Sequence, residues 1–171
     1  MDGKIAILFW LMSLPGGEYT LDGISTSRYN ADDRMAVSVG SIDFQERTVG
    51  WEPRFTYMFD QVYGRFNPII DVSISNSGAV WAGVGLYQQI DIHTLGQDFF
   101  AGFTFAPGIY FKGDDVDLGY PLEFRAGVEL GIRFESSWQL SLSYDHRSNA
   151  DISELNPGLE TLQIRLSKVF P

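Results

Sequence analysis

The sequence predicts an all-β protein, an eight-stranded antiparallel up-and-down transmembrane β-barrel. Three observations support this fold class. Apolar and polar residues alternate with a period of two along almost the whole chain after Asp33. No stretch shows a sustained period of 3.6 residues, as an amphipathic helix would. Turn-forming residues such as Asn76-Ser77-Gly78 separate the alternating segments, whose even number suits a barrel of consecutive neighbours.

Composition limits the classes of function. A chain of 171 residues with 44% hydrophobic and 15% aromatic residues fits one folded domain. Its 22 acidic and 12 basic residues give a formal charge of −10, which argues against a nucleic-acid partner. The absence of cysteine excludes disulfides and thiolate zinc sites. With His93 and His146 as the only histidines, no histidine-rich metal site is expected, and the sequence gives no reason to expect a cofactor.

The first residues form a distinct segment. Lys4 precedes an apolar run from Ile5 to Leu14, which is shorter than the about 20 residues that a membrane-spanning helix needs. Such a run suits the core of a signal peptide, and the alternatives are a buried N-terminal strand or a wrongly chosen start codon. We therefore divide the chain into residues 1–20, a signal peptide or N-terminal extension, and residues 21–171, a single β-barrel domain.

The predicted strands follow one another along the chain with short connections. They are residues 34–44, 49–61, 64–75, 79–90, 97–106, 120–134, 137–148 and 160–170. Gly40, Gly83 and Gly85 blur the alternation in the first and fourth strands. The second strand alternates clearly, with an apolar face of Trp51, Phe55, Tyr57 and Phe59 against Glu52, Arg54, Thr56 and Asp60.

The later strands show the clearest alternation. In 120–134 the apolar face is Leu122, Phe124, Ala126, Val128, Leu130, Ile132 and Phe134, and the opposite face carries Glu123, Arg125, Glu129 and Arg133. In 160–170 the apolar face is Leu162, Ile164, Leu166 and Phe170, with Lys168 as the exception, and the polar face is Thr161, Gln163, Arg165 and Ser167. Each strand therefore has one polar and one apolar face.

Two kinds of barrel fit this pattern. A soluble lipocalin-like carrier points its apolar residues inward, whereas an outer-membrane barrel has an apolar outer band and a polar lumen. The charged residues of 120–134 could form ion pairs in a narrow lumen, where Gly127 and Gly131 leave room. Large aromatic residues at segment ends suit interfacial belts, and they are Trp51, Phe66, Trp138, Tyr144 and Phe170. We predict the membrane barrel, with Arg54, Arg125, Arg133 and Arg165 paired to interior acids.

Three polar residues break the apolar face near the end of the chain. His146 and Ser148 end the face of 137–148, and Glu160 begins the face of the next strand. With periplasmic termini, all three would lie at the outer rim and face lipid, where polar groups are costly. An antiparallel pairing would place Glu160 across from His146, with Cβ atoms about 5 Å apart. The arrangement is that of a nucleophile, a general base and an orienting acid, although polar residues are also common at barrel rims.

The segment HRSNADISELNPGLE resembles the signature of the lipid A 3-O-deacylase family, PagL-like outer-membrane enzymes. In that signature His-x-Ser-Asn precedes a loop with Asn and Gly and an acidic residue twelve positions after the serine. The matching residues here are His146, Ser148, Asn149, Asn156, Gly158 and Glu160. The apolar C-terminal strand also resembles the C-terminal signature of outer-membrane barrels, although Pro171 follows Phe170.

This resemblance implies an outer-membrane serine esterase that removes the acyl chain at the 3-position of lipid A, and hence lipopolysaccharide as its partner. It implies Ser148 as the nucleophile, His146 as the general base and Glu160 as the orienting acid. Either Asn149 or Asn156, together with backbone N–H groups near Gly158, could help to build an oxyanion hole, although a loop asparagine is as often an Asx-turn residue. The rival from another class is a non-enzymatic structural or adhesive outer-membrane barrel. Whether the barrel forms a homodimer is left open by the sequence.

Two further signals have simpler interpretations. His93 is expected in a periplasmic turn as a surface residue, because no serine stands at a matching offset. Asp114, Asp115 and Asp117 could bind a divalent cation, but they lack EF-hand spacing and are better explained as a solvated outer loop.

Overall fold

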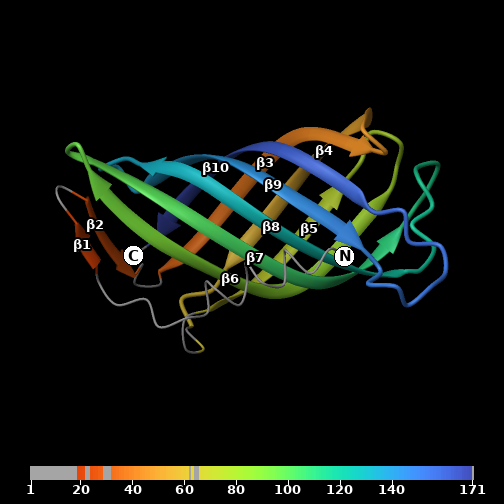
Figure 1. The fold of residues 1–171 in the computed structure, drawn as a ribbon, viewed down its shortest axis with the longest axis horizontal. Helices are drawn as coiled ribbons and strands as arrows, with labels where there is room; N and C mark the ends of the chain where they lie inside the picture. Colours follow the sequence, from red (N-terminus) through yellow and green to blue (C-terminus); the bar gives the residue numbers. More distant parts are fainter. Residues whose placement is uncertain (1–18, 22–23, 29–31, 62, 64–65, 171) are drawn as a thin grey trace.

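The computed structural model describes residues 19–21, 24–28, 32–61, 63 and 66–170, so residues 1–18 of the predicted signal peptide or extension lie outside it. Eight long strands form the barrel (Figure 1). They are β3 (Asp33–Phe44), β4 (Arg47–Met58), β5 (Asn67–Ile74), β6 (Val80–Thr94), β7 (Gln97–Phe111), β8 (Leu122–Arg133), β9 (Trp138–Ser148) and β10 (Leu159–Phe170). Among the described residues, no helix is long and apolar enough to cross a membrane.

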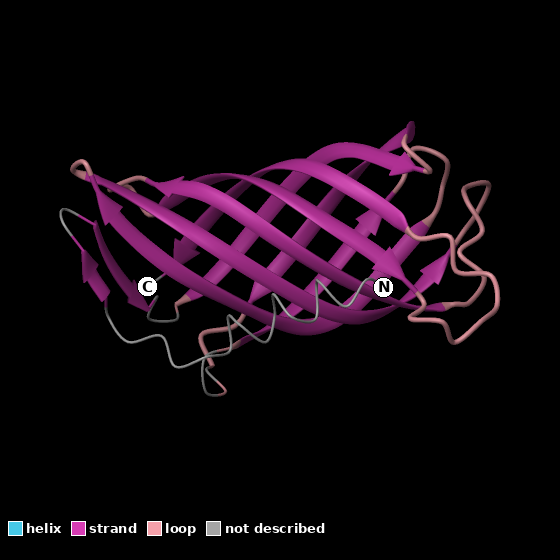
Figure 2. Ribbon diagram, in the orientation of Figure 1, coloured by secondary structure: helices cyan, strands magenta, loops and turns pink. Residues whose placement is uncertain are grey.

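The sheet closes on itself. Each of these strands pairs antiparallel with the next, and β10 returns to pair with β3, from Glu160 opposite Asp43 to Phe170 opposite Asp33. Figure 2 shows the strands wrapping around the barrel at a common tilt. Closure gives every barrel strand a partner on both sides, as a bilayer requires. The predicted fold class, an eight-stranded antiparallel barrel, is confirmed.

The two ends of the barrel differ in their connections. Loops 112–121 and 149–158 lie together at one end, whereas β6 and β7 are joined at the other by the tight turn Leu95–Gly96, with φ of 52° and 69° (Figure 1). Such φ values suit a two-residue hairpin turn. Because outer-membrane barrels have long extracellular loops and short periplasmic turns, the end with the two long loops is the outer end.

Strands β6 and β7 are longer than predicted. The sequence predicted 79–90 and 97–106, but β6 continues to Thr94, so that only two residues separate it from the start of β7 at Gln97. At its other end, β7 continues to Phe111. His93 consequently lies near the end of β6 rather than in a turn, which corrects that prediction. The prediction of a longer connection was wrong because the two-residue turn Leu95–Gly96 allows strand pairing up to Thr94 opposite Gln97.

A small hairpin that the sequence did not predict extends the sheet at the periplasmic end. Strands β1 (Tyr19–Leu21) and β2 (Ile24–Arg28) pair with each other, and β2 pairs with the lower part of β6 from Ile90 to Thr94. The pairing of β5 with β6 ends at Asn67 opposite Tyr87. Strand β2 therefore covers a stretch of β6 that would otherwise present an unpaired edge.

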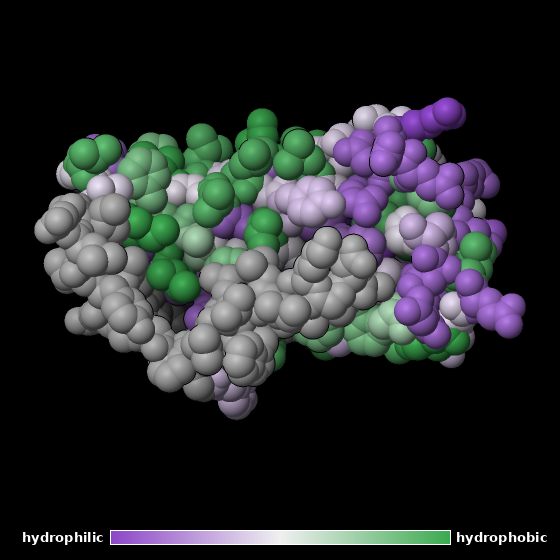
Figure 3. All heavy atoms as spheres, viewed as in Figure 1, coloured by the Kyte–Doolittle hydropathy of each residue, from purple (hydrophilic) through white to green (hydrophobic). Residues whose placement is uncertain are grey.

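The barrel is polar inside and apolar outside, as predicted for a membrane barrel and opposite to a lipocalin-like carrier. On β9, Ser141, Ser143 and Asp145 are buried in the lumen, whereas Leu142 and Tyr144 are about half exposed on the outer wall. Apolar side chains spread over the wall and polar ones gather at the end with the long loops (Figure 3). This distribution matches the apolar band of an outer-membrane barrel.

Ion pairs fill the lumen. Arg54 contacts Asp71 at 2.5 Å and Asp145 at 3.0 Å, and Arg125 pairs with both Asp145 and Glu52. The pairing of lumen arginines with interior acids is therefore confirmed, since Arg133 also contacts Asp91 and Arg165 lies 3.5 Å from Glu129. Some of these pairs join adjacent strands, such as Arg54 with Asp71, whereas Arg54 with Asp145 and Arg125 with Glu52 cross the lumen.

Candidate active site

His146 and Glu160 meet on the outer wall near the outer end of the barrel. They are register partners on β9 and β10, and His146 Nδ1 lies 3.0 Å from Glu160 Oε1. Their side chains are 20% and 34% exposed, so both remain accessible from the membrane side. The structure thus places these two residues together, as strand parity and loop length predicted. Because Nδ1 faces the carboxylate, Nε2 is the ring nitrogen left to exchange a proton with another group.

Ser148 ends β9, two residues after His146 and with the same parity. It lies opposite Phe124 on β8 and is only 2% exposed. Within the described chain its Oγ makes no hydrogen bond, either to His146 or to any other residue. A serine and a histidine can lie beyond bonding distance before a substrate is bound, and the contact then tightens in the complex. The hydroxyl is therefore uncommitted and close in sequence and space to the histidine–glutamate pair.

The two asparagines hold the loop that follows Ser148. The Asn149 backbone N–H donates to Asn156 Oδ1 at 3.0 Å, and Asn149 Nδ2 donates to the carbonyl oxygens of Leu118 and Leu155 at 2.8 Å each. Asn156 Nδ2 donates in turn to Asp151 Oδ1 at 2.8 Å. Since these N–H groups are already engaged, Asn149 and Asn156 act in this structure as ties within the loop. The sequence predicted them as oxyanion-hole residues.

Gly158 lies directly against the histidine. Its φ is +74°, and a Cβ built there would lie 2.7 Å from His146 Cε1. Glycine is the residue that accepts this backbone conformation and also leaves room for the imidazole. Gly158 therefore fixes one side of the imidazole without contributing a side chain.

A second loop supports the site, and sequence reasoning missed it. Leu118 is 1% exposed and belongs to the hydrophobic cluster of the barrel interior, while its carbonyl oxygen accepts the hydrogen bond from Asn149 Nδ2. At Gly119, with φ +88°, an added Cβ would lie 1.9 Å from the Leu155 carbonyl oxygen. The two outer loops are thus packed backbone against backbone. The only sequence signal was an apolar leucine at the end of the acidic segment KGDDVDLG.

Two acidic residues of that loop, Asp115 and Asp117, accept hydrogen bonds from other residues of the same loop. Lys112 Nζ contacts Asp117 at 2.7 Å, and this hydrogen bond lowers the pKa of the Asp117 carboxyl below its usual value. Asp115 accepts from the Val116 N–H at 2.8 Å. Among the residues that the structure describes, no group of three or more His, Cys, Asp or Glu side chains could hold a metal ion. At the opposite end of the barrel, His93 Nδ1 lies 2.5 Å from Asp98 Oδ1, far from His146.

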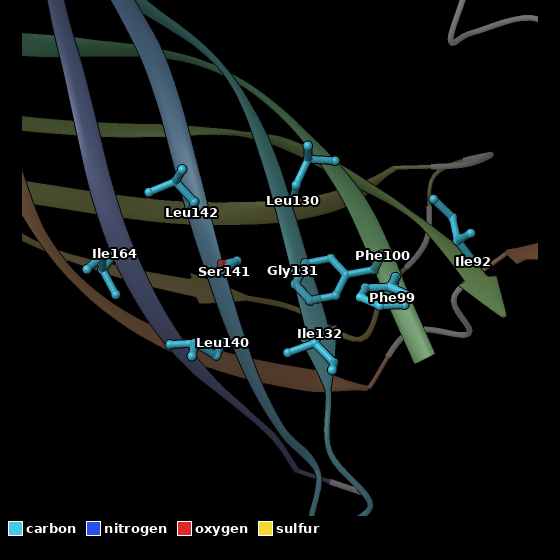
Figure 4. Close-up of a pocket in the computed structure, with 10 residues that line it drawn as sticks. All are labelled: Ile92, Phe99, Phe100, Leu130, Gly131, Ile132, Leu140, Ser141, Leu142 and Ile164. Carbon is cyan, nitrogen blue, oxygen red and sulfur yellow. The ribbon is translucent and has the colours of Figure 1, made fainter. Parts of the chain in front are cut away.

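An apolar groove lies on the outer wall below the site. Figure 4 shows its lining residues, which come from five adjacent strands, β6 to β10. Leu142 stands four residues before His146 on β9, and Ile164 stands four residues after Glu160 on β10. At about 3.3 Å per residue the groove lies roughly 13 Å from the histidine, toward the periplasmic side. The polar site and the apolar groove therefore share one face of the barrel.

Comparison with known proteins gives consistent matches. A family model described as Lipid A 3-O-deacylase (PagL) matches residues 44–168. Lipid A deacylase PagL of Bordetella bronchiseptica is 31% identical over 90 residues, which make up 53% of this chain and 44% of that protein, so the match spans less than half of the relative. The crystal structure of the outer membrane enzyme PagL is 14% identical with a TM-score of 0.67, over 80% of this chain and 99% of that one.

The family match covers most of the barrel. Residues 44–168 extend from the end of β3 almost to the end of β10. They include the pair formed by His146 and Glu160, together with Ser148 and the whole loop between them. The chain therefore belongs to the lipid A 3-O-deacylase (PagL) family.

Proposed function

We propose that this protein is a serine esterase that hydrolyses the ester-linked acyl chain at the 3-position of lipid A. As a member of this family with an apolar outer wall, the barrel resides in a bacterial outer membrane. The observation that carries the proposal is the 3.0 Å contact of His146 with Glu160 beside Ser148, on a wall that faces lipid. Polar groups are costly on that surface, so this combination calls for a chemical role.

The three side chains divide the reaction as in other serine hydrolases. Ser148 Oγ attacks the ester carbonyl carbon while His146 Nε2 accepts the hydroxyl proton. Glu160 fixes the Nδ1–H tautomer and stabilises the imidazolium that forms. The proton then passes to the departing sugar oxygen. Water, activated by the same imidazole, hydrolyses the acyl-serine ester and releases the fatty acid.

The negative charge on the tetrahedral intermediate needs hydrogen-bond donors. Backbone N–H groups near Gly158 lie beside the imidazole and are the donors we favour. Asn149 and Asn156 contribute by holding the loop in place, since their own N–H groups are bonded within it. Rearrangement of the loop on substrate binding would release the Asn149 amides to join the oxyanion hole.

The position of the site suits a membrane lipid. Acyl chains of lipid A in the outer leaflet lie against the barrel wall, and the groove at Leu142 and Ile164 offers them an apolar surface. The ester groups lie above those chains, near the headgroups, at the level where His146 stands. The enzyme can therefore reach the bond without extracting its substrate from the membrane.

Mass spectrometry of lipid A tests this proposal. Lipid A from cells that express the protein should lack one hydroxyacyl chain, with phosphates and sugars unchanged, whereas cells with Ser148→Ala should show the full set. If folded protein leaves several lipid A substrates unaltered in detergent, or if Ser148→Ala still removes the chain, the proposed mechanism is wrong. Unaltered lipid A would favour a structural or adhesive barrel.

A further inference from the structure

The histidine–glutamate pair belongs to a longer row of side chains. Five register partners follow one another around the outer wall, and they form what we call the outer row: Ala126 (β8), His146 (β9), Glu160 (β10), Asp43 (β3) and Thr48 (β4). Directly opposite residues on antiparallel strands point to the same face of a sheet. Asp43 therefore flanks Glu160 on the side away from His146.

A β-bulge sets the position of Asp43. The register between β3 and β4 shifts after Ile42, which pairs with Gly50. Asp43 then pairs with Thr48, and Val49 has no register partner on β3. Bulges of this kind re-aim a side chain and are common next to active sites. Without the shift, the pairing of β3 with β4 would place Val49 opposite Asp43. The bulge thus brings a hydroxyl to the carboxylate.

The Asp43 carboxylate is held by hydroxyl groups and not by a cation. Thr48 Oγ1 donates to Asp43 Oδ1 at 2.7 Å, and Ser41 Oγ donates to Asp43 Oδ2 at 3.3 Å. Among the described residues, neither Asp43 nor Glu160 forms an ion pair with lysine or arginine. The negative charge of Asp43 is therefore fixed in place and not neutralised by a neighbouring cation.

We propose that Asp43 is a positioning residue of the esterase, a second carboxylate that acts on His146 through Glu160. This inference rests on the proposed function. Repulsion between the two carboxylates turns Glu160 toward His146, and their combined negative potential favours the imidazolium that forms when His146 accepts the Ser148 proton. The outer row lies at the edge of the apolar wall, where charges are less screened than in bulk water.

Other charged groups near His146 are compensated or face elsewhere. Its sequence neighbours Asp145 and Arg147 point into the lumen, where Asp145 contacts Arg54 and Arg125, and Arg147 contacts Glu52. On the outer face, the other neighbours of His146 include Tyr144 and Ser148 on β9, Ala126 on β8 and Gly158, and none of these carries a charge at neutral pH. The negative charges that face the imidazole from packed elements are thus Glu160 and, one strand further, Asp43.

The effect of removing this charge follows from its distance. Two strand spacings of about 4.8 Å place Asp43 roughly 10 Å from His146. At that distance, loss of the charge in Asp43→Asn should lower kcat roughly three- to tenfold. Because the imidazolium is then less favoured, the acidic limb of the kcat profile should move to lower pH, by roughly half to one pH unit. KM should change little, because the groove is untouched.

Two matched variants separate this role from others. Asp43→Glu keeps the charge and should restore most of kcat and the pH profile. Glu46→Gln removes an exposed negative charge three residues away, in the turn of the same hairpin, and should leave both unchanged. All variants are assayed as full-length protein on purified lipid A in detergent, and their unfolding temperatures are measured.

The outcomes are decisive. A wild-type kcat and pH profile in Asp43→Asn overturns the inference, and so does an equal shift in Glu46→Gln. A lower unfolding temperature with an unmoved pH profile, not rescued by Asp43→Glu, means that Asp43 only supports the bulge and also overturns it. The Ser148→Ala enzyme is assayed in parallel. If it retains activity, the proposed function itself fails, whereas an inactive Ser148→Ala with a normal Asp43→Asn refutes only the role of Asp43.

Discussion

Alternate residues of one strand supply two polar regions that differ in kind. Asp145 and Arg147 of β9 point into the lumen, whereas His146 and Ser148 face the outer wall. In the lumen, the guanidinium and carboxylate groups of β9 contact opposite charges on β4 and β8, and their side chains are at most 3% exposed. On the wall, His146 and Glu160 are partly exposed, and Ser148 Oγ makes no hydrogen bond within the described chain.

The difference separates architecture from chemistry. The buried ion-pair network holds strands in one arrangement, and its charged groups are enclosed in the lumen away from any membrane lipid. The wall residues retain hydrogen-bonding capacity, through His146 Nε2 and Ser148 Oγ, on a surface where unsatisfied polar groups are unfavourable. Substitutions in the two regions should therefore fail in different ways, in activity on the wall and in stability within the lumen.

The largest effect is expected at the proposed nucleophile and base. Ser148→Ala and His146→Asn should each lower kcat on the order of 10⁶-fold, because triad members act as a unit, and the double variant should be no worse than either single one. Circular dichroism should show an intact barrel for all three. Additive losses, with the double variant orders of magnitude weaker, would show that the two residues act independently.

Glu160→Ala should have the next largest effect on activity. Loss of the orienting acid leaves nucleophile and base in place but frees the histidine tautomer, which in serine hydrolases costs on the order of 10⁴-fold in kcat. Glu154→Gln, an exposed acid in the loop between Ser148 and Glu160, is the matched control and should behave as wild type. Kinetics on lipid A measure both. Equal losses in the two variants would assign the effect to the charge of the loop.

Much of this arrangement could be predicted from sequence, because strand parity is a local property. A period of two fixes which side chains share a face, so the meeting of His146 with Glu160 follows from counting residues. The polar lumen and the exposed Leu142 and Ile164 also required the charged residues of 120–134 and the aromatic residues at segment ends, which distinguish a membrane barrel from a soluble one. The contact of His146 and Glu160 joins neighbouring strands across a single loop. Its register depends only on the length of that loop.

Contacts that depend on closure could not be predicted. Asp43 stands beside Glu160 only because β10 pairs with β3 in one register, which no local pattern specifies. The partnership of Arg125 with Glu52 likewise depends on strand tilt across the lumen. The packing of Leu118 under the site arises where two loops meet. Long-range geometry is thus the part of the site that the sequence leaves undetermined.

Within the lumen, Glu52→Gln should lower stability more than activity. Glu52 accepts hydrogen bonds from Arg125, Arg147 and Gln163, so its neutralisation leaves two buried guanidinium groups without their shared carboxylate. Breaking such a pair costs about 3–5 kcal/mol of unfolding free energy. Urea unfolding in lipid vesicles measures it. Glu123→Gln is the control, a buried carboxylate without a hydrogen bond among the described residues, and it should cost less.

On the outer wall, Leu142→Arg should impair membrane assembly. Leu142 is 53% exposed to the membrane, where a basic residue at mid-depth costs about 2–4 kcal/mol. Ser143→Arg should be milder, because Ser143 faces the lumen opposite Glu129, which can pair with the new guanidinium. Folding yields in vesicles compare the two variants. Greater damage from Ser143→Arg would mean that lumen space, and not lipid contact, limits the barrel.

The smallest effect concerns Gly158, where backbone strain and contact with the histidine can be separated. Gly158→Ala adds a Cβ at φ +74°, which should cost roughly 1–2 kcal/mol of stability, and that Cβ would lie 2.7 Å from His146 Cε1. Gly78→Ala provides the same strain, at φ +84°, with no atom within 4 Å of the new Cβ. Both variants should therefore lose similar stability in urea unfolding. Only Gly158→Ala should also lower kcat, by roughly tenfold, because a displaced imidazole no longer lines up with Ser148. Equal kcat values in the two variants would show that the imidazole moves aside without loss, and that Gly158 serves the backbone alone.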